Sequence, residues 1–495
     1  MSQEKLGIRK ALSLSFAQTC ISLIFSIATI VILSRLLTPA ETGVYSVAVG
    51  FVALVHMLRD FGVSEFVVQD PSLGNDVIRT AFTMNLIIAW CLAAILFASS
   101  ALIGLFYGDP GVTRVTRVMS LVFVLLPFGT THMAIMKRNF RFDTILKIRL
   151  GETIVRGGTT IALAYAGFTY MSMAWGSVAG MAALILGCEI WGWEYRVRGI
   201  SFAYWKRVMH FGWNRTLSDL VTQMGTQSAN IVVGKMFGMA AAGFYSRGYG
   251  IVNLFVSNVV GAVGNVAFPA YAREHRETNT APQLFLTSVA YLTGIGWPFF
   301  AFCTLMAFPI MRIAFGNQWD AAVPLMRWLC GAAVVGTLTF QCNSFFTAIG
   351  RYRDVTRVEL QYQLTRVALT ILAAFYSLEA VAAAQVLVYM VAAVLYYREI
   401  VQYKSTSLRN IVVALLPSGL VTLSSCAVPA AVLCLWPGSS MRHYVLAFAV
   451  AAAGSGLGWL LAIVLTKHPL LSEIQRGISS VVRRMRRPST PADAR

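Results

Sequence analysis

One stretch of the chain carries a stripe of polar side chains through an otherwise apolar segment. The stripe consists of Arg215, Asp219, Gln223, Gln227 and Asn230, at steps of 4, 4, 4 and 3 residues. This spacing places all five side chains on one face of a helix. A charged side chain at the centre of a membrane helix costs roughly 2.5–3.5 kcal/mol, so such a face meets protein or water. The stripe therefore either lines a wet cavity or holds helices together through hydrogen bonds.

The single carboxylate of this stripe, Asp219, is the candidate site for a coupling ion. A carboxylate within a membrane can take up a proton or a sodium ion on one side and release it on the other. Arg215 lies four residues earlier, where an ion pair with Asp219 is the alternative. The matching face of the first apolar segment is milder, because Thr19 stands where the later segment has Asp219.

Other arginines in apolar segments are candidates for binding an anion. Arg247 and Asn258 share one stripe of the segment after the polar helix, and Arg156 and Arg366 lie in two further segments. The planar guanidinium meets phosphate oxygens with two hydrogen bonds, which makes arginine suited to a diphosphate. Arg247 has an alternative role as an interfacial anchor that reaches out to the headgroups. Glu152, four residues before Arg156, offers a neutralising ion pair instead, and Glu359, on the same helix face as Arg366, offers the same alternative there.

Arg59 and Asp60 interrupt the end of the second apolar segment and are candidates for a gate. A plain helix terminus explains them equally well.

Signals of an enzyme or of a metal site are absent from the sequence. There is no HExxH, GxSxG or Walker motif, and no cysteine pair has CxxC spacing. All eight cysteines lie in apolar segments, where they are expected to act as small packing residues. We expect no catalytic residue, no metal and no cofactor. Without a nucleotide-binding motif, any transport is facilitated or ion-coupled.

Composition shows what must position these residues. Hydrophobic residues make up 57% of the 495-residue chain, charged residues 12%, and the mean hydropathy is +0.66. Soluble domains carry about 25% charged residues, so lipid is the expected solvent. Only helices or closed barrels span it, and long apolar runs without alternation indicate helices. We predict an all-α polytopic membrane protein with about fourteen spans: 11–33, 44–66, 81–106, 115–136, 148–168, 170–193, 211–233, 243–268, 284–308, 323–348, 358–377, 379–397, 411–434 and 444–465.

The net charge of +19 is distributed as in a membrane protein rather than a nucleic-acid-binding protein. Basic residues cluster in every second loop, for example at 137–149, 196–207 and 351–357, which is the positive-inside pattern. This pattern places both termini in the cytoplasm. The basic run at 483–487 is expected to be disordered and attracted to anionic headgroups.

The chain also repeats itself at an interval of 200 residues. Gly43-Val44-Tyr45-Ser46 is matched by Gly243-Phe244-Tyr245-Ser246. Six spans per copy give both copies the same orientation, so the symmetry axis runs along the membrane normal. The expected parts are two six-helix bundles related by pseudo-two-fold symmetry (1–200 and 201–405), two further spans (406–466) and a basic cytoplasmic tail (467–495).

Several of these motifs resemble those of Wzx-type polysaccharide flippases, in the multidrug/oligosaccharidyl-lipid/polysaccharide exporter superfamily. The resemblance is carried by 33–46 (LSRLLTPAETGVYS), 58–65 (LRDFGVSE), 136–142 (MKRNFRF) and 243–246 (GFYS), and covers most of the chain. It implies a bacterial inner-membrane protein that moves an undecaprenyl-diphosphate-linked oligosaccharide by alternating access, for exopolysaccharide, O-antigen or capsule synthesis.

The resemblance also implies partners and leaves one alternative. The expected partners are the lipid-linked oligosaccharide, membrane lipids, the polysaccharide polymerase and the export machinery, with no nucleic acid. A multidrug or other lipid exporter of the same superfamily is the alternative, although its cavity would favour acidic groups over the basic ones found in this chain.

Overall fold

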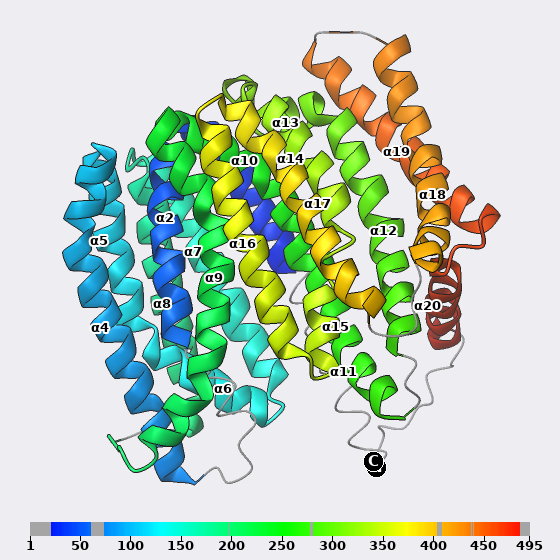
Figure 1. Ribbon diagram of the computed structural model, residues 1–495. Coiled ribbons are helices and arrows are strands. Elements are labelled where there is room, and N and C mark those ends of the chain that lie inside the picture. Colours follow the sequence, from blue (N-terminus) through cyan, green and yellow to red (C-terminus); the bar gives the residue numbers. More distant parts are fainter. Residues whose placement is uncertain are drawn as a thin grey trace, which may run out of the picture. The chain divides into compact units, whose positions relative to one another are not determined.

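The computed structural model describes residues 21–60, 74–197, 199–277, 281–402, 408–436, 438 and 440–485. At 60, 207–219, 408, 410, 477, 478 and 480–485 it describes the backbone only. The described residues contain helices and no strand, which confirms the predicted all-α class (Figure 1).

The described chain forms two compact units, each made of segments that are distant in the sequence. Unit 1 comprises residues up to 248 together with 314–325 and 359–384, and unit 2 comprises 249–313, 326–358 and 385 onward.

In chain order, the first helices are Ile21–Leu36, α2 (Pro39–Asp60), α4 (Asn75–Tyr107), α5 (Pro110–Leu125), α6 (Pro127–Arg138), α7 (Phe142–Tyr165), α8 (Met171–Trp191), the short η1 (Trp193–Tyr195) and α9 (Trp205–Phe237). Next come α10 (Met239–Phe255), the π-turn η2 (Val256–Val260), α11 (Gly261–Glu277), α12 (Ala281–Leu305), α13 (Ala307–Ala314), η3 (Asn317–Trp319) and α14 (Ala322–Gly336). The last are α15 (Cys342–Ala348), α16 (Tyr352–Ala374), α17 (Leu378–Gln402), α18 (Leu408–Leu435), α19 (Met441–Leu465) and α20 (Leu470–Met485).

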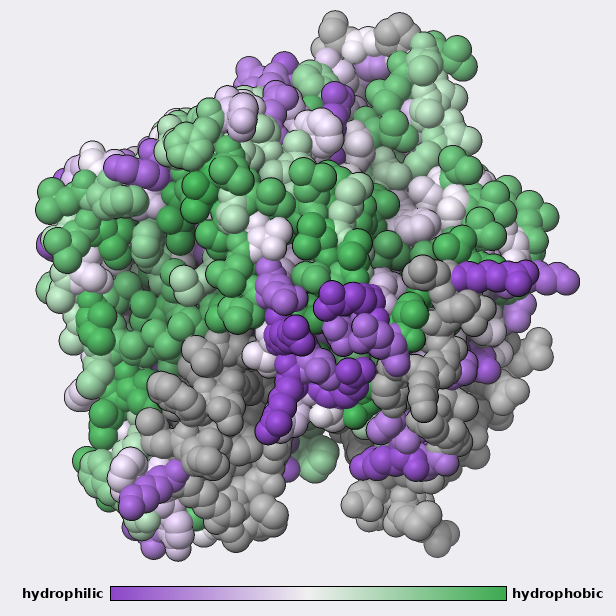
Figure 2. Space-filling view, viewed as in Figure 1, coloured by the Kyte–Doolittle hydropathy of each residue, from purple (hydrophilic) through white to green (hydrophobic). Residues whose placement is uncertain are grey.

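Each of the fourteen predicted spans overlaps helical structure. Among the described residues, 8 helices are long and apolar enough to cross a membrane, or 9 if α5 and α6 count as one bent span. Large apolar side chains on these helices face outward, such as Leu105 of α4 at 78% exposed and Leu423 of α18 at 72%. Figure 2 shows the corresponding hydrophobic surface over α4. Such surfaces belong in lipid, and the chain is a multi-pass membrane protein.

Three boundaries differ from the predictions. The second span begins at Pro39 rather than residue 44, because Thr38 and Glu41 form a capping box: Thr38 N donates to Glu41 Oε2 (2.8 Å) and Glu41 N donates to Thr38 Oγ1 (3.3 Å). The predicted span 115–136 is bent by 47° between α5 and α6, where Pro127 interrupts the helix. The tail is helical as far as Met485, in α20, rather than disordered from residue 483.

Residues related by the 200-residue repeat meet each other inside unit 1. A Cβ on Gly43 would lie 1.7 Å from the carbonyl oxygen of Met239, and one on Gly243 would lie 2.0 Å from that of Pro39. Ser46 Oγ donates to Ser246 Oγ over 3.0 Å. Reciprocal contacts of this kind are the signature of a two-fold axis. The two glycines are needed because any side chain would separate the helix ends.

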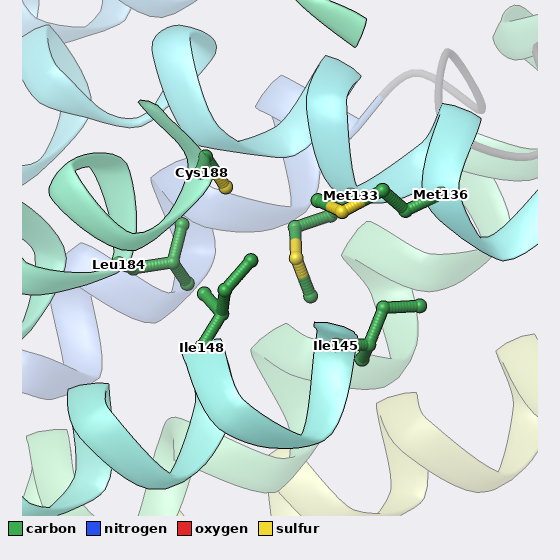
Figure 3. Close-up of a cluster of buried hydrophobic side chains, with 6 residues drawn as sticks. All are labelled: Met133, Met136, Ile145, Ile148, Leu184 and Cys188. Carbon is green, nitrogen blue, oxygen red and sulfur yellow. The ribbon is translucent and has the colours of Figure 1, made fainter. Parts of the chain in front are cut away.

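Close approach of α7 and α8 fixes the part of unit 1 that holds Arg156. Gly176 and Gly180 form a Gly-x3-Gly pair on α8, and Cβ atoms there would lie 1.9 Å from Thr160 Oγ1 and 2.7 Å from Arg156 Cβ. In lipid, where the hydrophobic effect between helices is lost, such backbone proximity supplies the packing energy. At one end of these helices a buried cluster joins them to α6 (Figure 3), made of Met133, Met136, Ile145, Ile148, Leu184 and Cys188.

In unit 2, the buried His468, in the segment after α19, contacts the two earlier helices α12 and α18. His468 Nδ1 accepts from Leu470 N (3.2 Å), and its Nε2 lies 3.1 Å from Ser418 Oγ of α18. A Cβ on Gly294 of α12 would lie 2.6 Å from the ring. Burial lowers the pKa of His468, which favours the neutral ring that these contacts require.

Candidate functional site

The polar stripe of α9 is partly used in helix packing within unit 1. Asn230 Nδ2 donates to Gln227 Oε1 over 3.2 Å. A Cβ on Gly50 of α2 would lie 3.8 Å from that same oxygen, so Gln227 faces α2. Gln223 is half-buried. The side chains of Arg215 and Asp219 lie outside the described part of α9, so cavity lining and ion coupling by these residues stay predictions.

A different face of α9 meets a buried carboxylate on α16. Thr222 Oγ1 donates to Glu359 Oε1 over 3.2 Å, and Gln363 Nε2 donates to the same oxygen over 2.7 Å. Glu359 is buried, at 7% exposed. A Cβ on Gly225 of α9 would lie only 1.8 Å from Gln363 Oε1, so a glycine there lets the network form. Hydrogen bonds from two helices thus stabilise this carboxylate.

Arg366 continues this network along α16. Its NH1 lies 3.5 Å from Gln363 Oε1, its NH2 donates to Tyr362 Oη, and its Cζ lies 4.8 Å from the centre of the Tyr362 ring. Arg366 is 8% exposed. Buried polar groups joined in this manner rigidify a helix interface. The guanidinium is thus bonded to residues of its own helix, and substrate binding by Arg366 stays a prediction.

Arg156 instead lines a cavity of about 310 Å³ within unit 1. Its Nε lies 3.4 Å from Glu152 Oε1, and its side chain keeps 47% of its surface exposed. Across the cavity the hydroxyls of Tyr45 and Ser177 lie 3.3 Å apart. The complete lining is Ser26, Thr29, Ile30, Leu33, Tyr45, Thr153, Arg156, Gly157, Thr160, Met173 and Ser177. This wall offers a guanidinium and several hydroxyls without a carboxylate, which suits an anion or the hydroxyls of a sugar.

Arg247 lies between two aromatic rings of unit 1. Its Cζ is 5.3 Å from the ring centre of Phe315 and 4.8 Å from that of Trp319. Its Nε is buried and has no hydrogen-bond partner, and no acidic side chain pairs with Arg247 among the described residues. Aromatic faces stabilise a cation without neutralising it. A guanidinium in these surroundings keeps its charge and its hydrogen-bond donors for an anion.

One of the two rings near Arg247, that of Trp319, is hydrogen-bonded to the end of the first helix. Trp319 Nε1 donates to the carbonyl oxygen of Ser34 (2.8 Å), and Gln318 Nε2 donates to the carbonyl oxygens of Ser34 (2.6 Å) and Leu37 (3.2 Å). The last carbonyls of a helix lack partners within the helix, so η3 satisfies them. The sequence does not reveal these contacts of Trp319, because about 70 residues separate it from Arg247 and nearly 300 separate it from Ser34.

The remaining candidates lie apart from these contacts or outside what is described. Asn258, in unit 2, sits in the π-turn η2 and donates to the carbonyl oxygen of Leu254 over 2.8 Å, within its own helix. π-turns occur frequently at functional sites. Arg59 is buried near the end of α2, at 5% exposed. The side chain of Asp60 lies outside the described residues, so the gate stays a prediction. No group of acidic, histidine or cysteine residues in the described ranges could hold a metal ion.

Known structures share this fold. The lipid II flippase MurJ in its inward closed conformation superposes with a TM-score of 0.74 at 12% identity, over 93% of this chain and 100% of that one. An inward-facing multidrug resistance MATE transporter of the MOP superfamily gives 0.61 at 16% identity, over 78% of this chain and 96% of that one. At these identities the likeness concerns the fold alone.

Curated proteins are similar in sequence over part of their length. The lipopolysaccharide biosynthesis protein WzxC of Escherichia coli (strain K12) is 22% identical over 62% of both chains. The teichuronic acid biosynthesis protein TuaB of Bacillus subtilis (strain 168) is 23% identical over 68% of this chain and 70% of its own. The succinoglycan biosynthesis transport protein ExoT of Rhizobium meliloti (strain 1021) is 26% identical over 64% of both. The match thus spans just under two thirds of WzxC and ExoT.

The family comparison covers more than half of the chain. Residues 32–324 match the family described as polysaccharide biosynthesis protein, a region that contains the contact between Gly43 and Gly243, most of the hydroxyl-lined cavity and Arg247. The chain therefore belongs to this polysaccharide biosynthesis protein family.

Proposed function

We propose that the protein flips an undecaprenyl-diphosphate-linked oligosaccharide repeat unit across the bacterial inner membrane, by alternating access, for synthesis of a surface polysaccharide. Both termini then lie in the cytoplasm, as the positive-inside pattern predicts. Relatives named for lipopolysaccharide, teichuronic acid and succinoglycan synthesis support the substrate class. Their different products leave the glycan open.

The observation that carries this proposal is the environment of Arg247. Its guanidinium, on a half-buried side chain with a buried Nε, lies near two aromatic rings and has no acidic partner among the described residues. An uncompensated buried charge is costly, and binding an anion removes that cost. A diphosphate is the anionic group of the proposed substrate, whereas a cationic drug would be repelled.

An apolar groove in unit 2 supports the lipid part of the substrate. It measures about 650 Å³ and lies among α17, α18 and the turn after α14. Its lining residues are Leu338, Ala393, Val394, Tyr397, Arg398, Val401, Gln402, Ile411 and Val412. Nearly all of this lining is hydrocarbon, which suits a polyprenyl chain. Figure 2 shows a hydrophilic patch over the C-terminal end of α17. Glu399, near the C-terminal end of α17, lies 3.6 Å from Arg351.

The first test is the fate of the lipid-linked glycan in a deletion strain. We expect the complete oligosaccharide-lipid to accumulate on the cytoplasmic face and the exported polymer to disappear, as measured with a membrane-sidedness probe. Unchanged glycans together with altered sensitivity to cationic drugs would assign the protein to drug export instead.

The second test asks whether Arg247 binds the diphosphate. Complementation with Arg247→Ala is expected to lower flipping by about tenfold or more, the cost of losing a charge-assisted contact. Arg247→Lys should retain part of the activity, because it keeps the charge and loses the planar fork. Arg273→Ala is the matched control, since the Arg273 side chain is 68% exposed and pairs with Glu277. Equal activity of the alanine and lysine variants would contradict two-pronged phosphate binding.

The coupling role of Asp219 is tested separately. Asp219→Asn keeps the size of the side chain and removes its charge. We expect flipping to fall while the protein level in the membrane is unchanged, because the amide cannot exchange a proton or hold sodium. Full flipping activity of this variant would remove Asp219 as the coupling site.

A further inference from the structure

The segment between α8 and α9, described at 192–197 and 199–204, presents large aromatic and aliphatic side chains outward although it is not a membrane span. Trp193 is 66% exposed, Ile200 69% and Phe202 54%. The flanking helix ends add Trp191 at 47% and Trp205 at 47%. Water is a poor environment for such a surface. Trp and Tyr concentrate where a membrane meets water, because their rings suit the headgroup level.

This segment is held in place, so the exposure is not that of a loose loop. Ser201 N donates to Thr83 Oγ1 of α4 over 3.2 Å, and Thr80 Oγ1 donates to Ser201 Oγ over 3.2 Å. Tyr195 and Val197 turn inward and pack on a buried cluster of α4 and α6. The segment therefore has one side fastened to the protein and one side directed outward.

A pocket of about 270 Å³ lies between this segment, the start of α4 and α6. Its lining carries charges of both signs: Arg79 and Arg196 on one hand, Glu194 on the other. Arg79 lies 3.6 Å from Asp76, and Arg196 lies 3.5 Å from Glu189, and all four side chains stay partly exposed. The rest of the lining is Asn75, Ile78, Ile135, Tyr195 and Val197. Glu194 is exposed and makes no ion pair with any residue the structure describes.

We infer that this pocket binds the headgroup of a zwitterionic phospholipid with a primary ammonium, such as phosphatidylethanolamine. The exposed guanidinium groups of Arg79 and Arg196 exchange their contacts with Asp76 and Glu189 for hydrogen bonds to the phosphate. The ammonium donates to the carboxylate of Glu194. The outward rings of Trp193 and Phe202 lie against the adjoining lipid. An anionic headgroup would accept hydrogen bonds from the two arginines, but its charge would be repelled by Glu194. A choline headgroup has no N–H group to donate to Glu194. The site does not depend on the proposed flipping reaction.

The test measures which lipids stay bound to the purified full-length protein. The protein is mixed with equal amounts of phosphatidylethanolamine, phosphatidylcholine and phosphatidylglycerol, and retained lipids are counted by native mass spectrometry. We expect phosphatidylethanolamine to be preferred over phosphatidylcholine by about two- to fivefold, as one exposed ion pair allows. Equal retention of the two lipids, or a preference for phosphatidylglycerol, would overturn the inference.

Three variants separate the parts of the site. Glu194→Gln is expected to abolish the preference over phosphatidylcholine without reducing total retention, because the exposed carboxylate is not needed for folding. Trp193→Ala is expected to lower retention of all three lipids and leave the preference intact. Glu379→Gln, an exposed glutamate at the start of α17, is the matched control and should behave as wild type. A Glu194→Gln protein with the wild-type preference would overturn the assignment of Glu194.

Discussion

Arg156 and Arg366 occupy similar places in the two copies of the repeat, yet their surroundings differ in exposure and in bonding. Arg156 pairs with Glu152 on its own helix, and its side chain is 47% exposed to a hydroxyl-lined cavity. Arg366 is 8% exposed and is bonded to Tyr362 and Gln363 inside the interface of α9 and α16. Both places thus carry a guanidinium. The neighbours decide whether it serves a ligand or the packing of the helices.

The same contrast extends to the acidic partners of the two arginines. Glu152 lies four residues before Arg156 and contacts it directly, at 3.4 Å. Glu359 reaches Arg366 through Gln363, whose amide donates to Glu359 and whose oxygen faces the guanidinium. The ion pair between Glu152 and Arg156 can separate without breaking a contact between helices, because both residues lie on α7. The network of Glu359, Gln363 and Arg366 also bonds to Thr222 of α9, so its loss disrupts the interface of α9 and α16. We therefore expect mutations in the two copies to affect different properties.

The largest expected effect on stability comes from removing the buried arginine. Arg366→Leu keeps much of the side-chain volume and leaves Gln363, Tyr362 and Glu359 without part of their network. Breaking a buried charged network costs about 3 kcal/mol or more. We expect the free energy of unfolding to fall by this amount in an SDS titration. Arg366→Lys should lie between this variant and wild type, and wild-type stability of Arg366→Leu would show that the network contributes little.

A smaller effect is expected where α9 approaches α16. Gly225→Ala places a Cβ 1.8 Å from Gln363 Oε1, so the network must shift, at about 1–3 kcal/mol. Gly158→Ala, on α7 in the first copy, is the matched control, because a Cβ there meets nothing within 4 Å. The control should be neutral or slightly stabilising, since alanine favours helix by up to about 1 kcal/mol. Equal unfolding free energies for the two variants in the SDS titration would contradict the close contact.

The sequence predicted the helices well, for a physical reason. Length and apolarity of a span are local properties, so all fourteen predicted segments overlap helices. The repeat of Gly43 at Gly243 indicated a two-fold relation, and the two glycines prove to be in reciprocal contact. The bend at Pro127 and the capping box at Thr38 are also local features, and the proline and the Thr-x-x-Glu spacing that produce them are visible in the sequence.

The candidate site was less accessible from the sequence because its neighbours are distant along the chain. Spacing alone placed Gln227 and Asn230 on the polar face of a helix, but the contact of Gln227 with Gly50 depends on how α9 packs on α2. The aromatic rings around Arg247 and the inward bonding of Arg366 likewise come from tertiary structure. A sequence pattern identifies polar groups in a membrane; packing decides which of them a ligand can reach.

The smallest expected effect on stability, and a large one on flipping, comes from Arg156→Ala. A half-exposed ion pair contributes at most about 1 kcal/mol, so the unfolding free energy should change little. Flipping should fall by about tenfold, because the cavity loses its single cationic group while its hydroxyls remain. Glu152→Gln is the matched control: it removes the ion pair and leaves the guanidinium in the cavity, so flipping should persist. If Glu152→Gln lowered flipping as much as Arg156→Ala, loss of the ion pair rather than loss of ligand binding would explain the effect, because both variants remove that pair. The two arginines would then both serve helix packing.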